Sequence, residues 1–338
     1  MALFKKKGKD GKKGVDRYMD MVQLVVEPDL AFVTAITNAC HVSKQAAILD
    51  SIVYIMERQE KTIEIIKHGI TQTVKETQDG GTLFRENTTV TKLMTAYAKT
   101  IGKNYLVNTL KRLVTLLFSS TEGFEVNPAK ADPDEDLVEN LNNLMDWCER
   151  FVEQIVQTVD AAPIQFREIC QHLQVETAPK FPKSQHMVVG GFIFLRFFCP
   201  AILSPQQSGL ANDLPTPEQR RRLVLVAKAL QNLSNGVQYG SKEAYLNAMN
   251  EFFDDYQGIL YNYFDAMATL PDSHVVSSAP TSGLVQLEDS DLPSLHSLHK
   301  FVYESKDAMV AAMEKEGNAE LLANFHAMLE ALGTPPKT

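Results

Sequence analysis

The stretch "VENLNNLMDWCERFVEQIVQTV", residues 138–159, decides the fold class. Its apolar residues recur three or four positions apart, which places them on one face of an α-helix. These residues are Val138, Leu141, Leu144, Met145, Cys148, Val152, Ile155, Val156 and Val159. The same spacing recurs over residues 249–267, and it predicts further helices at 29–40, 44–69, 88–118, 164–173, 184–199, 216–235 and 295–331. Because alternation with a period of two is nearly absent, the sequence predicts an all-α protein.

Segments rich in proline, serine and glycine indicate how the chain is divided. The longest, residues 272–294, is a predicted linker between a main helical domain, residues 15–271, and a C-terminal helical segment, residues 295–331. The C-terminal segment is predicted to be a pair of helices that either docks back on the main domain or binds a partner. Residues 1–14 are predicted to be a basic, disordered tail. A chain of 338 residues, 44% of them hydrophobic, is long enough to bury a core of this size.

Charge and cysteine usage restrict the partners and the compartment. The net charge of −9 argues against nucleic acid as the main partner. The first 14 residues nevertheless carry six lysines against one aspartate, so this segment either contacts anionic lipid or is a solvated end. The chain has four cysteines, Cys40, Cys148, Cys170 and Cys199. They form no C-x-x-C pair, and three of them lie in apolar periodic stretches. We therefore predict a cytoplasmic protein, with recruitment to the inner face of the plasma membrane left open.

The familiar motifs of nucleotide, metal and nucleophile sites are missing from the sequence. The nearest approach to a P-loop, "GVQYGSK" at residues 236–242, has its glycines too close together and its Ser and Lys reversed. The eight histidines show no H-E-x-x-H spacing, and no segment resembles a G-x-S-x-G elbow. The sequence therefore predicts that the chain holds no cofactor and no metal of its own.

Two arginines stand in unusual surroundings. In "GGTLFREN", residues 80–87, Arg85 follows a glycine pair and precedes a predicted helix, with no obvious carboxylate partner. In "GGFIFLRFFCPAILSP", residues 190–205, Arg196 lies within a helix that should be buried nearly all round. The five N–H donors of a buried arginine need partners, because an unpaired charge in the interior is costly. Arg196 therefore either forms an internal salt bridge or donates to the backbone carbonyls of a neighbouring loop, and spacing leaves both open.

Four sequence blocks, in order over roughly residues 45–270, resemble the Ras GTPase-activating protein family. The segment "FLRFFCPAILSP" (194–205) is similar to the family signature F-L-R-x-x-x-P-A-[IV]-x-x-P. The other blocks are "TLFRENTTVTKLM" (82–94), "FEVNPAK" (124–130) and "LVAKALQNLSNG" (225–236). This resemblance implies an irregular helical RasGAP-like domain that binds a Ras-family small GTPase in its GTP-bound form. It also implies that the partner holds GTP and Mg²⁺, so the chain is an activator without a hydrolase site of its own.

The resemblance also assigns roles to residues. Arg85 matches the arginine finger, a planar cation that reaches into the GTPase active site in trans and stabilises the charge that develops on the transferring phosphoryl group. Arg196 matches the arginine that braces the finger loop and helps position the catalytic glutamine of the GTPase. The residues matched to the GTPase-binding surface are Leu83, Phe84, Leu195, Lys228, Gln231, Asn232 and Asn235.

One departure keeps a second function in view. Glu86 follows Arg85 where many family members have a small or neutral residue, which leaves the strength and selectivity of the activity undecided. The alternative to an activator is a GAP-like scaffold that binds a GTPase but catalyses poorly. The intact T-L-F-R block favours the activator, whereas the choice between Ras, Rap and their relatives stays open.

Overall fold

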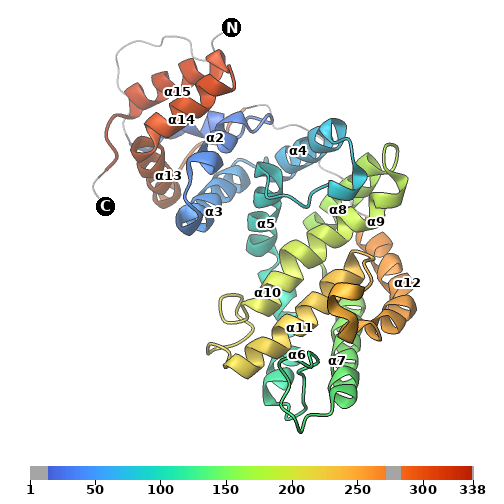
Figure 1. Cartoon of the computed structure of the whole chain (residues 1–338). Coiled ribbons are helices and arrows are strands. Elements are labelled where there is room, and N and C mark those ends of the chain that lie inside the picture. Colours follow the sequence, from blue (N-terminus) through green and yellow to red (C-terminus); the bar gives the residue numbers. More distant parts are fainter. Residues whose placement is uncertain (1–13, 272–282, 337–338) are drawn as a thin grey trace. The chain divides into compact units, whose positions relative to one another are not determined.

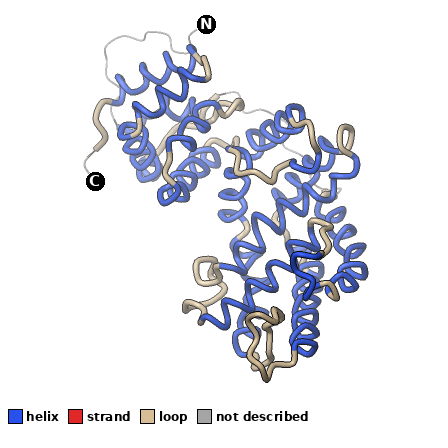
Figure 2. Tube along the Cα trace, in the orientation of Figure 1, coloured by secondary structure: helices blue, strands red, loops and turns tan. Residues whose placement is uncertain are grey.

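The computed structural model describes residues 14–271 and 283–336 of the chain. Within these two ranges every regular element is helical and none is a strand, which confirms the predicted all-α fold (Figure 2). The predicted basic tail, apart from Gly14, lies outside the described residues, as does the first half of the predicted linker.

The described residues pack into two compact units, which we treat separately. The terminal unit comprises residues 14–72, 87–97 and 283–336, and the central unit comprises residues 73–86 and 98–271. This packing does not decide where the predicted domain, linker and C-terminal segment begin and end, so those boundaries stay predictions.

The terminal unit combines helices from both ends of the chain (Figure 1). Its elements are η1 (Gly14–Tyr18), α1 (Met19–Val25), α2 (Ala31–Ala39), α3 (Val42–Arg58), η7 (Asp289–Asp291), α13 (Leu292–Glu304), α14 (Lys306–Lys315) and α15 (Ala319–Leu332). Helix α13 packs on α3, and α14 packs on α2. The predicted pair of C-terminal helices is therefore wrong in number. Gly317, with a φ of 68°, ends one helix, and the Asn318 side chain caps the next by accepting from the Leu321 N–H at 3.0 Å.

Two predicted long helices are each two helices in the structure. Residues 44–69 divide into α3 and α4 (Thr62–Glu76), and residues 88–118 divide into α5 (Thr89–Ile101) and α6 (Lys103–Ser119). The first break occurs at Glu60, whose φ of 57° lies in the left-handed region that an L-residue rarely adopts. No glycine or proline marks this break, so the spacing of the apolar residues predicted a single helix across it. Helices α4 and α5 each contribute residues to both units.

The central unit is built mainly from six further helices and the segments that join them (Figure 1). These helices are α7 (Leu137–Gln157), α8 (Ile164–Thr177), α9 (Gln185–Gly190), α10 (Cys199–Leu203), α11 (Pro217–Ser234) and α12 (Met249–Met267), and the 3-10 turns are η2 (Gly80–Thr82), η3 (Val159–Ala161), η4 (Pro182–Ser184) and η6 (Ser241–Leu246). Helix α11 contacts α6, α7, α10 and α12 and so lies at the centre of the packing. Helices α7, α11 and α12 begin and end within two residues of their predicted bounds.

The apolar segment around Arg196 is one continuous helix with a π-helical stretch inside it. This stretch, η5 (Gly191–Phe198), joins α9 to α10, and the Cys199 N–H donates to the Phe194 carbonyl five residues back. Pro200 lacks an N–H and its ring crowds the carbonyl four residues earlier, which favours a wider turn before it. Residues Pro182–Leu203 are long and apolar enough to span a membrane, but 67% of that window is buried inside the structure, as in a core helix.

The core of the central unit requires close approach between helices. Buried phenylalanines from α8, η5 and α12 meet there in edge-on pairs: Phe166, Phe192, Phe194, Phe197 and Phe264. A Cβ atom on Gly190 would lie 2.8 Å from the Ser234 carbonyl oxygen of α11, so only glycine allows this contact. These contacts pack α9 and η5 closely against α8, α11 and α12.

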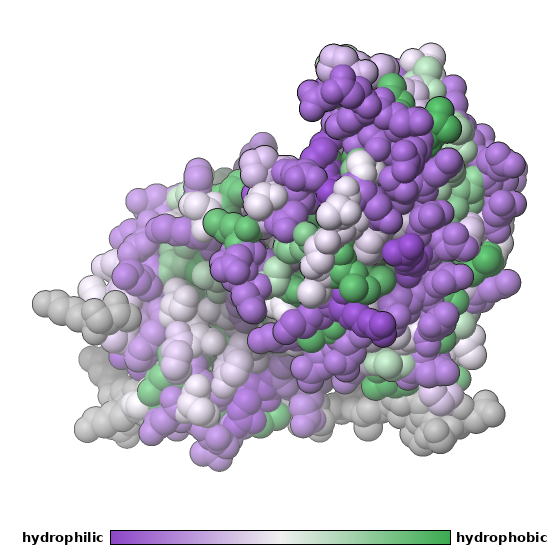
Figure 3. Space-filling model, turned by 90° about the horizontal axis from the view of Figure 1, so that it is seen from below, coloured by the Kyte–Doolittle hydropathy of each residue, from purple (hydrophilic) through white to green (hydrophobic). Residues whose placement is uncertain are grey.

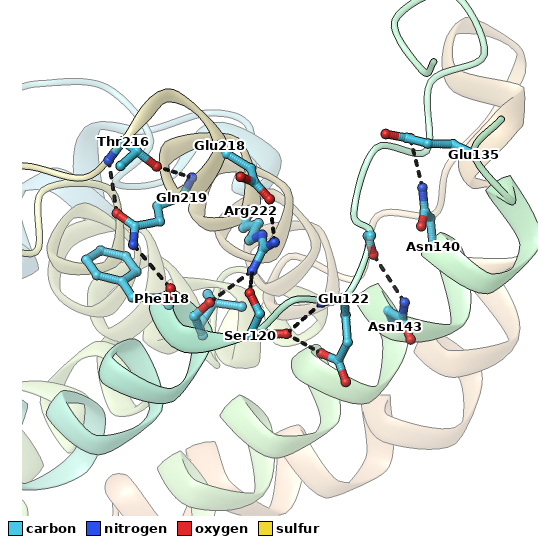
Figure 4. A network of polar contacts seen from close by, with 12 residues as sticks. Phe118, Ser120, Glu122, Glu135, Asn140, Asn143, Thr216, Glu218, Gln219 and Arg222 are labelled. Atoms are coloured by element: carbon cyan, nitrogen blue, oxygen red, sulfur yellow. Dashed lines mark hydrogen bonds and ion pairs between the residues drawn. The ribbon is translucent and has the colours of Figure 1, made fainter. Parts of the chain in front are cut away.

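Polar side chains of α11 and α7 hold the end of α6 and the segment that follows it (Figure 4). Arg222 of α11, nearly buried, donates to the carbonyls of Leu117 and Ser120 and pairs with Glu218. Gln219 completes a capping box with Thr216 and donates to the Phe118 carbonyl at 3.2 Å. On the side of α7, the side-chain amides of Asn140 and Asn143 donate to the carbonyls of Glu125 and Gly123.

The surface carries polar and apolar side chains together. The face in Figure 3 is mostly hydrophilic, with hydrophobic areas of limited extent among the hydrophilic residues. Among the described residues the most exposed large apolar side chains are Val42, Val138 and Leu214. They belong to three different segments, and exposed apolar residues of this kind do not by themselves define a docking surface.

Candidate functional site

Arg85 lies on a loop of the central unit whose backbone is tightly folded. We call residues 77–86, which follow α4, the finger loop. The Asp79 side chain accepts from the Gly81 N–H at 2.9 Å, and the Thr82 carbonyl accepts from the Arg85 N–H at 3.2 Å. Phe84 has a φ of 54°, a left-handed conformation that costs roughly 1–2 kcal/mol for an L-residue. Its side chain is buried, so packing of the ring helps to hold this backbone conformation.

Arg196 binds the far end of the finger loop through backbone oxygens. The residue is 6% exposed, and its Nη2 donates to the carbonyls of Phe84, Arg85 and Glu86 at 2.6, 3.3 and 2.9 Å. Of the two alternatives left open by the sequence, this geometry is the second, donation to a neighbouring loop. Burial lowers the pKa of the Arg196 guanidinium from its ordinary value. The guanidinium therefore holds three successive carbonyls around the residue predicted to be catalytic.

The Arg85 side chain is exposed and has one weak partner. Its Nη2 lies 3.3 Å from the Met187 sulfur of α9, and among the described residues this is its one hydrogen bond or ion pair with another side chain. A thioether sulfur is a weak acceptor. Little interaction energy would be lost if the guanidinium turned toward a stronger, anionic partner.

A pocket of about 300 Å³ opens beside Arg85, within the central unit. Six predicted site residues line it, together with Met187 and Gly191: Leu83, Phe84, Arg85, Leu195, Gln231 and Asn235. Met187, Gly191 and Leu195 are spaced four apart and so share one helix face, and Gln231 and Asn235 share a face of α11. Leu83 and Phe84 line the pocket with little exposed surface, whereas Leu195, Gln231 and Asn235 are half-buried.

Lys228 and Asn232 are not among the pocket-lining residues, although they lie on the same helix as Gln231. Lys228 forms an ion pair with Glu243, and the Lys228 hydrogen bond is the main cause of a lowered pKa at Glu243. The Lys228 side chain remains 39% exposed. Burial raises the pKa of Tyr239, and a hydrogen bond from the Asn232 side chain acts in the opposite direction. Asn232 therefore faces Tyr239.

Three residues beside the predicted site were missed in the sequence. Met187 contacts the guanidinium of Arg85, Gly191 lines the pocket, and Glu243 pairs with Lys228. The two four-residue steps, from Met187 to Gly191 and from Gly191 to Leu195, were the signal for the first two. Glu243 lies 15 residues from Lys228 along the chain, and only the tertiary fold brings the two together.

Comparison with known proteins identifies a family whose model matches the central part of the chain. Residues 65–134 and 130–235 match the RasGAP family model, described as GTPase-activator protein for Ras-like GTPase, and together span half of the chain. These ranges include the finger loop, Arg196, Lys228 and the other predicted site residues of α11.

Relatives from distant organisms align over much of the chain. A Dictyostelium discoideum protein described as a probable Ras GTPase-activating-like protein, ngap, is 30% identical over 258 residues, which is 75% of this chain and 29% of that protein. The human Ras GTPase-activating protein 1 is 28% identical over 321 residues, 94% of this chain and 30% of that protein. The mouse RAS protein activator like-3 is 36% identical over 214 residues, 61% of this chain and 20% of that protein.

The chain spans less than a third of the length of each of these relatives. The match nevertheless covers the helices and loops that hold the candidate site, and it joins the four sequence blocks to an all-helical fold. On these grounds the chain belongs to the Ras GTPase-activating protein (RasGAP) family.

Proposed function

We propose that the chain stimulates GTP hydrolysis by a Ras-family GTPase in its GTP-bound form, and that it does so by supplying Arg85 in trans. In this proposal the partner holds GTP and Mg²⁺, and the chain provides charge and position. Arg196 orders the finger loop, and the surface around the pocket receives the part of the GTPase that surrounds its nucleotide.

The observation that carries the proposal is the pairing of an exposed arginine with a fixed backbone. Arg85 is exposed and has a weak sulfur partner, whereas its own carbonyl and those of both neighbours are bound by Arg196. An interaction accelerates a reaction only if it is stronger in the transition state than in the ground state. A guanidinium held on a preordered loop meets this condition, because little reorganisation is needed when charge develops on the phosphoryl oxygens.

The test compares binding with chemistry at Arg85. In single-turnover assays with GTP-loaded GTPases, Arg85→Ala should lower the maximal rate by about 10³-fold, a magnitude carried over from arginine-finger enzymes, Ras–GAP pairs among them. The activator concentration at half-saturation should change far less. Arg85→Lys should restore little activity, because an ammonium cannot donate two parallel bonds as the guanidinium does. Arg112→Ala removes an exposed arginine of α6 outside the pocket and is the matched control.

A second measurement isolates the transition state. Aluminium fluoride with GDP mimics the transferring phosphoryl group, so it should lock the unmodified chain onto the GTPase and fail to lock Arg85→Ala. If Arg85→Ala stimulates hydrolysis as well as the unmodified chain, the finger assignment is wrong. If the unmodified chain binds the GTPase without stimulating it, the scaffold is the correct function.

A further inference from the structure

The C-terminal end of α4, where the finger loop begins, has every one of its last four carbonyls bonded. These carbonyls have no partner within a helix and need donors from elsewhere. The Thr73 carbonyl accepts from the N–H and hydroxyl of Thr77, and the Glu76 carbonyl accepts from the Gln78 side chain. The remaining two, at Val74 and Lys75, accept from Lys180.

Lys180 thus binds the start of the finger loop as Arg196 binds its end. The ammonium donates to the carbonyls of Val74, Lys75 and Thr77 at 3.1, 2.8 and 2.6 Å. Lys180 lies just beyond the end of α8, far from α4 in sequence. A cation at this position also faces the negative end of the α4 dipole. All three donors of the ammonium are directed at main-chain oxygens.

The turn that follows Lys180 also packs against the finger loop. A Cβ atom on Gly80 would lie 2.7 Å from the Ser184 hydroxyl and 2.8 Å from a ring carbon of Phe181. The Lys180 ammonium is 5.3 Å from the centre of the same Phe181 ring. Lys180 therefore fixes the last carbonyls of α4 and the first carbonyl of the loop, while Phe181 and Ser184 fix the position of Gly80.

We infer that Lys180 is a positioning residue for Arg85: its ammonium fixes where α4 ends, and together with Arg196 it holds the finger loop at both ends. This inference rests on the proposed function for its kinetic part. A loop released at its start would still carry Arg85, but the guanidinium would spend less time at the phosphoryl group. Such a loss lowers the rate of chemistry more than the affinity for the ground state, because Arg85 contributes mainly to the transition state.

The experiment uses the full chain with Lys180→Met, Lys180→Arg and, as the matched control, Lys183→Met at an exposed lysine three residues further on. Lys180→Met should lower the maximal single-turnover rate by about tenfold and change half-saturation by less than about twofold. Lys180→Arg should recover most of the rate, and Lys183→Met should leave it unchanged. Hydrogen exchange of the amides of residues 77–86, measured without any GTPase, should quicken in Lys180→Met while exchange in α7 stays the same.

A double mutant separates positioning from general stabilisation. If Lys180 acts through Arg85, Lys180→Met should cost little further rate in the Arg85→Ala background, because the group that it positions is gone. An equal loss in both backgrounds would overturn the inference, as would unchanged exchange of residues 77–86. If the unmodified chain stimulates no GTPase, the proposed function fails. The exchange measurement still decides then whether Lys180 orders the loop.

Discussion

Lys228 and Arg85 are both cations near the candidate site, but their partners differ in strength. Arg85 contacts a neutral sulfur, whereas Lys228 pairs with the carboxylate of Glu243. Glu243 also accepts from the Tyr245 hydroxyl at 3.2 Å. Partly exposed ion pairs contribute only about 0–1 kcal/mol to stability, because water competes for both groups. Lys228 can therefore exchange its internal partner for a carboxylate of a docking protein at small cost.

Lys228→Met and Glu243→Gln test whether this charge is used in docking. Both variants break the same ion pair, so both should change the free energy of unfolding by about 1 kcal/mol or less. Only Lys228→Met removes the positive charge, and it should raise the activator concentration at half-saturation, most clearly at low salt. Glu243→Gln frees the ammonium and should leave half-saturation unchanged or lower it. Equal weakening in the two variants would show that the pair acts as a structural contact and not as a docking charge.

At the scale of elements, α11 joins the site to the segment before α7. Its C-terminal half supplies Gln231 and Asn235 to the pocket, and its N-terminal half supplies Arg221 and Arg222 to residues 117–125. Arg221 binds the Glu125 carboxylate through two bonds of 2.8 and 2.7 Å. Burial raises the pKa of Glu125, but the Arg221 pair and the Asn127 N–H together outweigh burial and lower this pKa below its ordinary value. The neighbouring Arg222 also pairs with a carboxylate, that of Glu218, but it donates in addition to the main-chain carbonyls of Leu117 and Ser120.

These adjacent arginines should differ in what their removal costs. Arg222→Met leaves the nearly buried carbonyls of Leu117 and Ser120 without their donor, so it should lower the free energy of unfolding by about 2 kcal/mol. Arg221→Met breaks a partly exposed pair and should cost about 1 kcal/mol or less. Urea unfolding of the two variants against the unmodified chain measures the difference. Equal losses would mean that burial of the Arg222 side chain does not set its contribution.

How far the sequence predicts these elements depends on whether the signal is local. The apolar spacing of α7 and of α12 was sufficient to place those helices, and the surroundings of Arg85 and Arg196 indicated one exposed and one buried side chain. The break at Glu60 was not predicted, because no glycine or proline marks it, and the π-helical turn was not predicted although Pro200 was a local signal for it. The contacts that Met187 and Lys180 form were not predicted either, because their partners lie about a hundred residues away in sequence.

At the scale of the whole molecule, the terminal unit contains a buried histidine that links its first and last helices. His299 of α13 is fully buried, with Nε2 3.1 Å from the Gly333 carbonyl and Nδ1 3.4 Å from the Tyr18 hydroxyl. Since a carbonyl can only accept, Nε2 carries the proton and Nδ1 accepts from Tyr18 in the neutral ring. Burial lowers the pKa of His299 below its ordinary value of 6.5. The hydrogen bond to the Gly333 carbonyl opposes this effect, whereas Arg17 and His296 act in the same direction as burial.

The terminal unit should therefore lose stability as the solution becomes acidic. Below about pH 6.5 the unfolded chain binds a proton at His299 that the folded chain does not, so the free energy of unfolding falls as pH falls toward the lower, folded pKa. Hydrogen exchange in α13 should quicken between about pH 7.5 and 5.5, after correction for the intrinsic pH dependence of exchange. His299→Gln removes the titration and should flatten this dependence. A slope unchanged by the substitution would assign the effect to another group.

The contacts that anchor the finger loop have a consequence for how this activity can change through mutation. Arg196 and Lys180 bind carbonyl oxygens, which all amino acids share, so the loop's path depends little on which side chains occupy residues 85 and 86. Under the proposed function, a single substitution at Arg85 would abolish chemistry while the loop keeps its shape and the proposed docking surface stays in place. An activator and a non-catalytic binder would then differ by a single substitution in the same fold, and evolution from one to the other would require no change of structure.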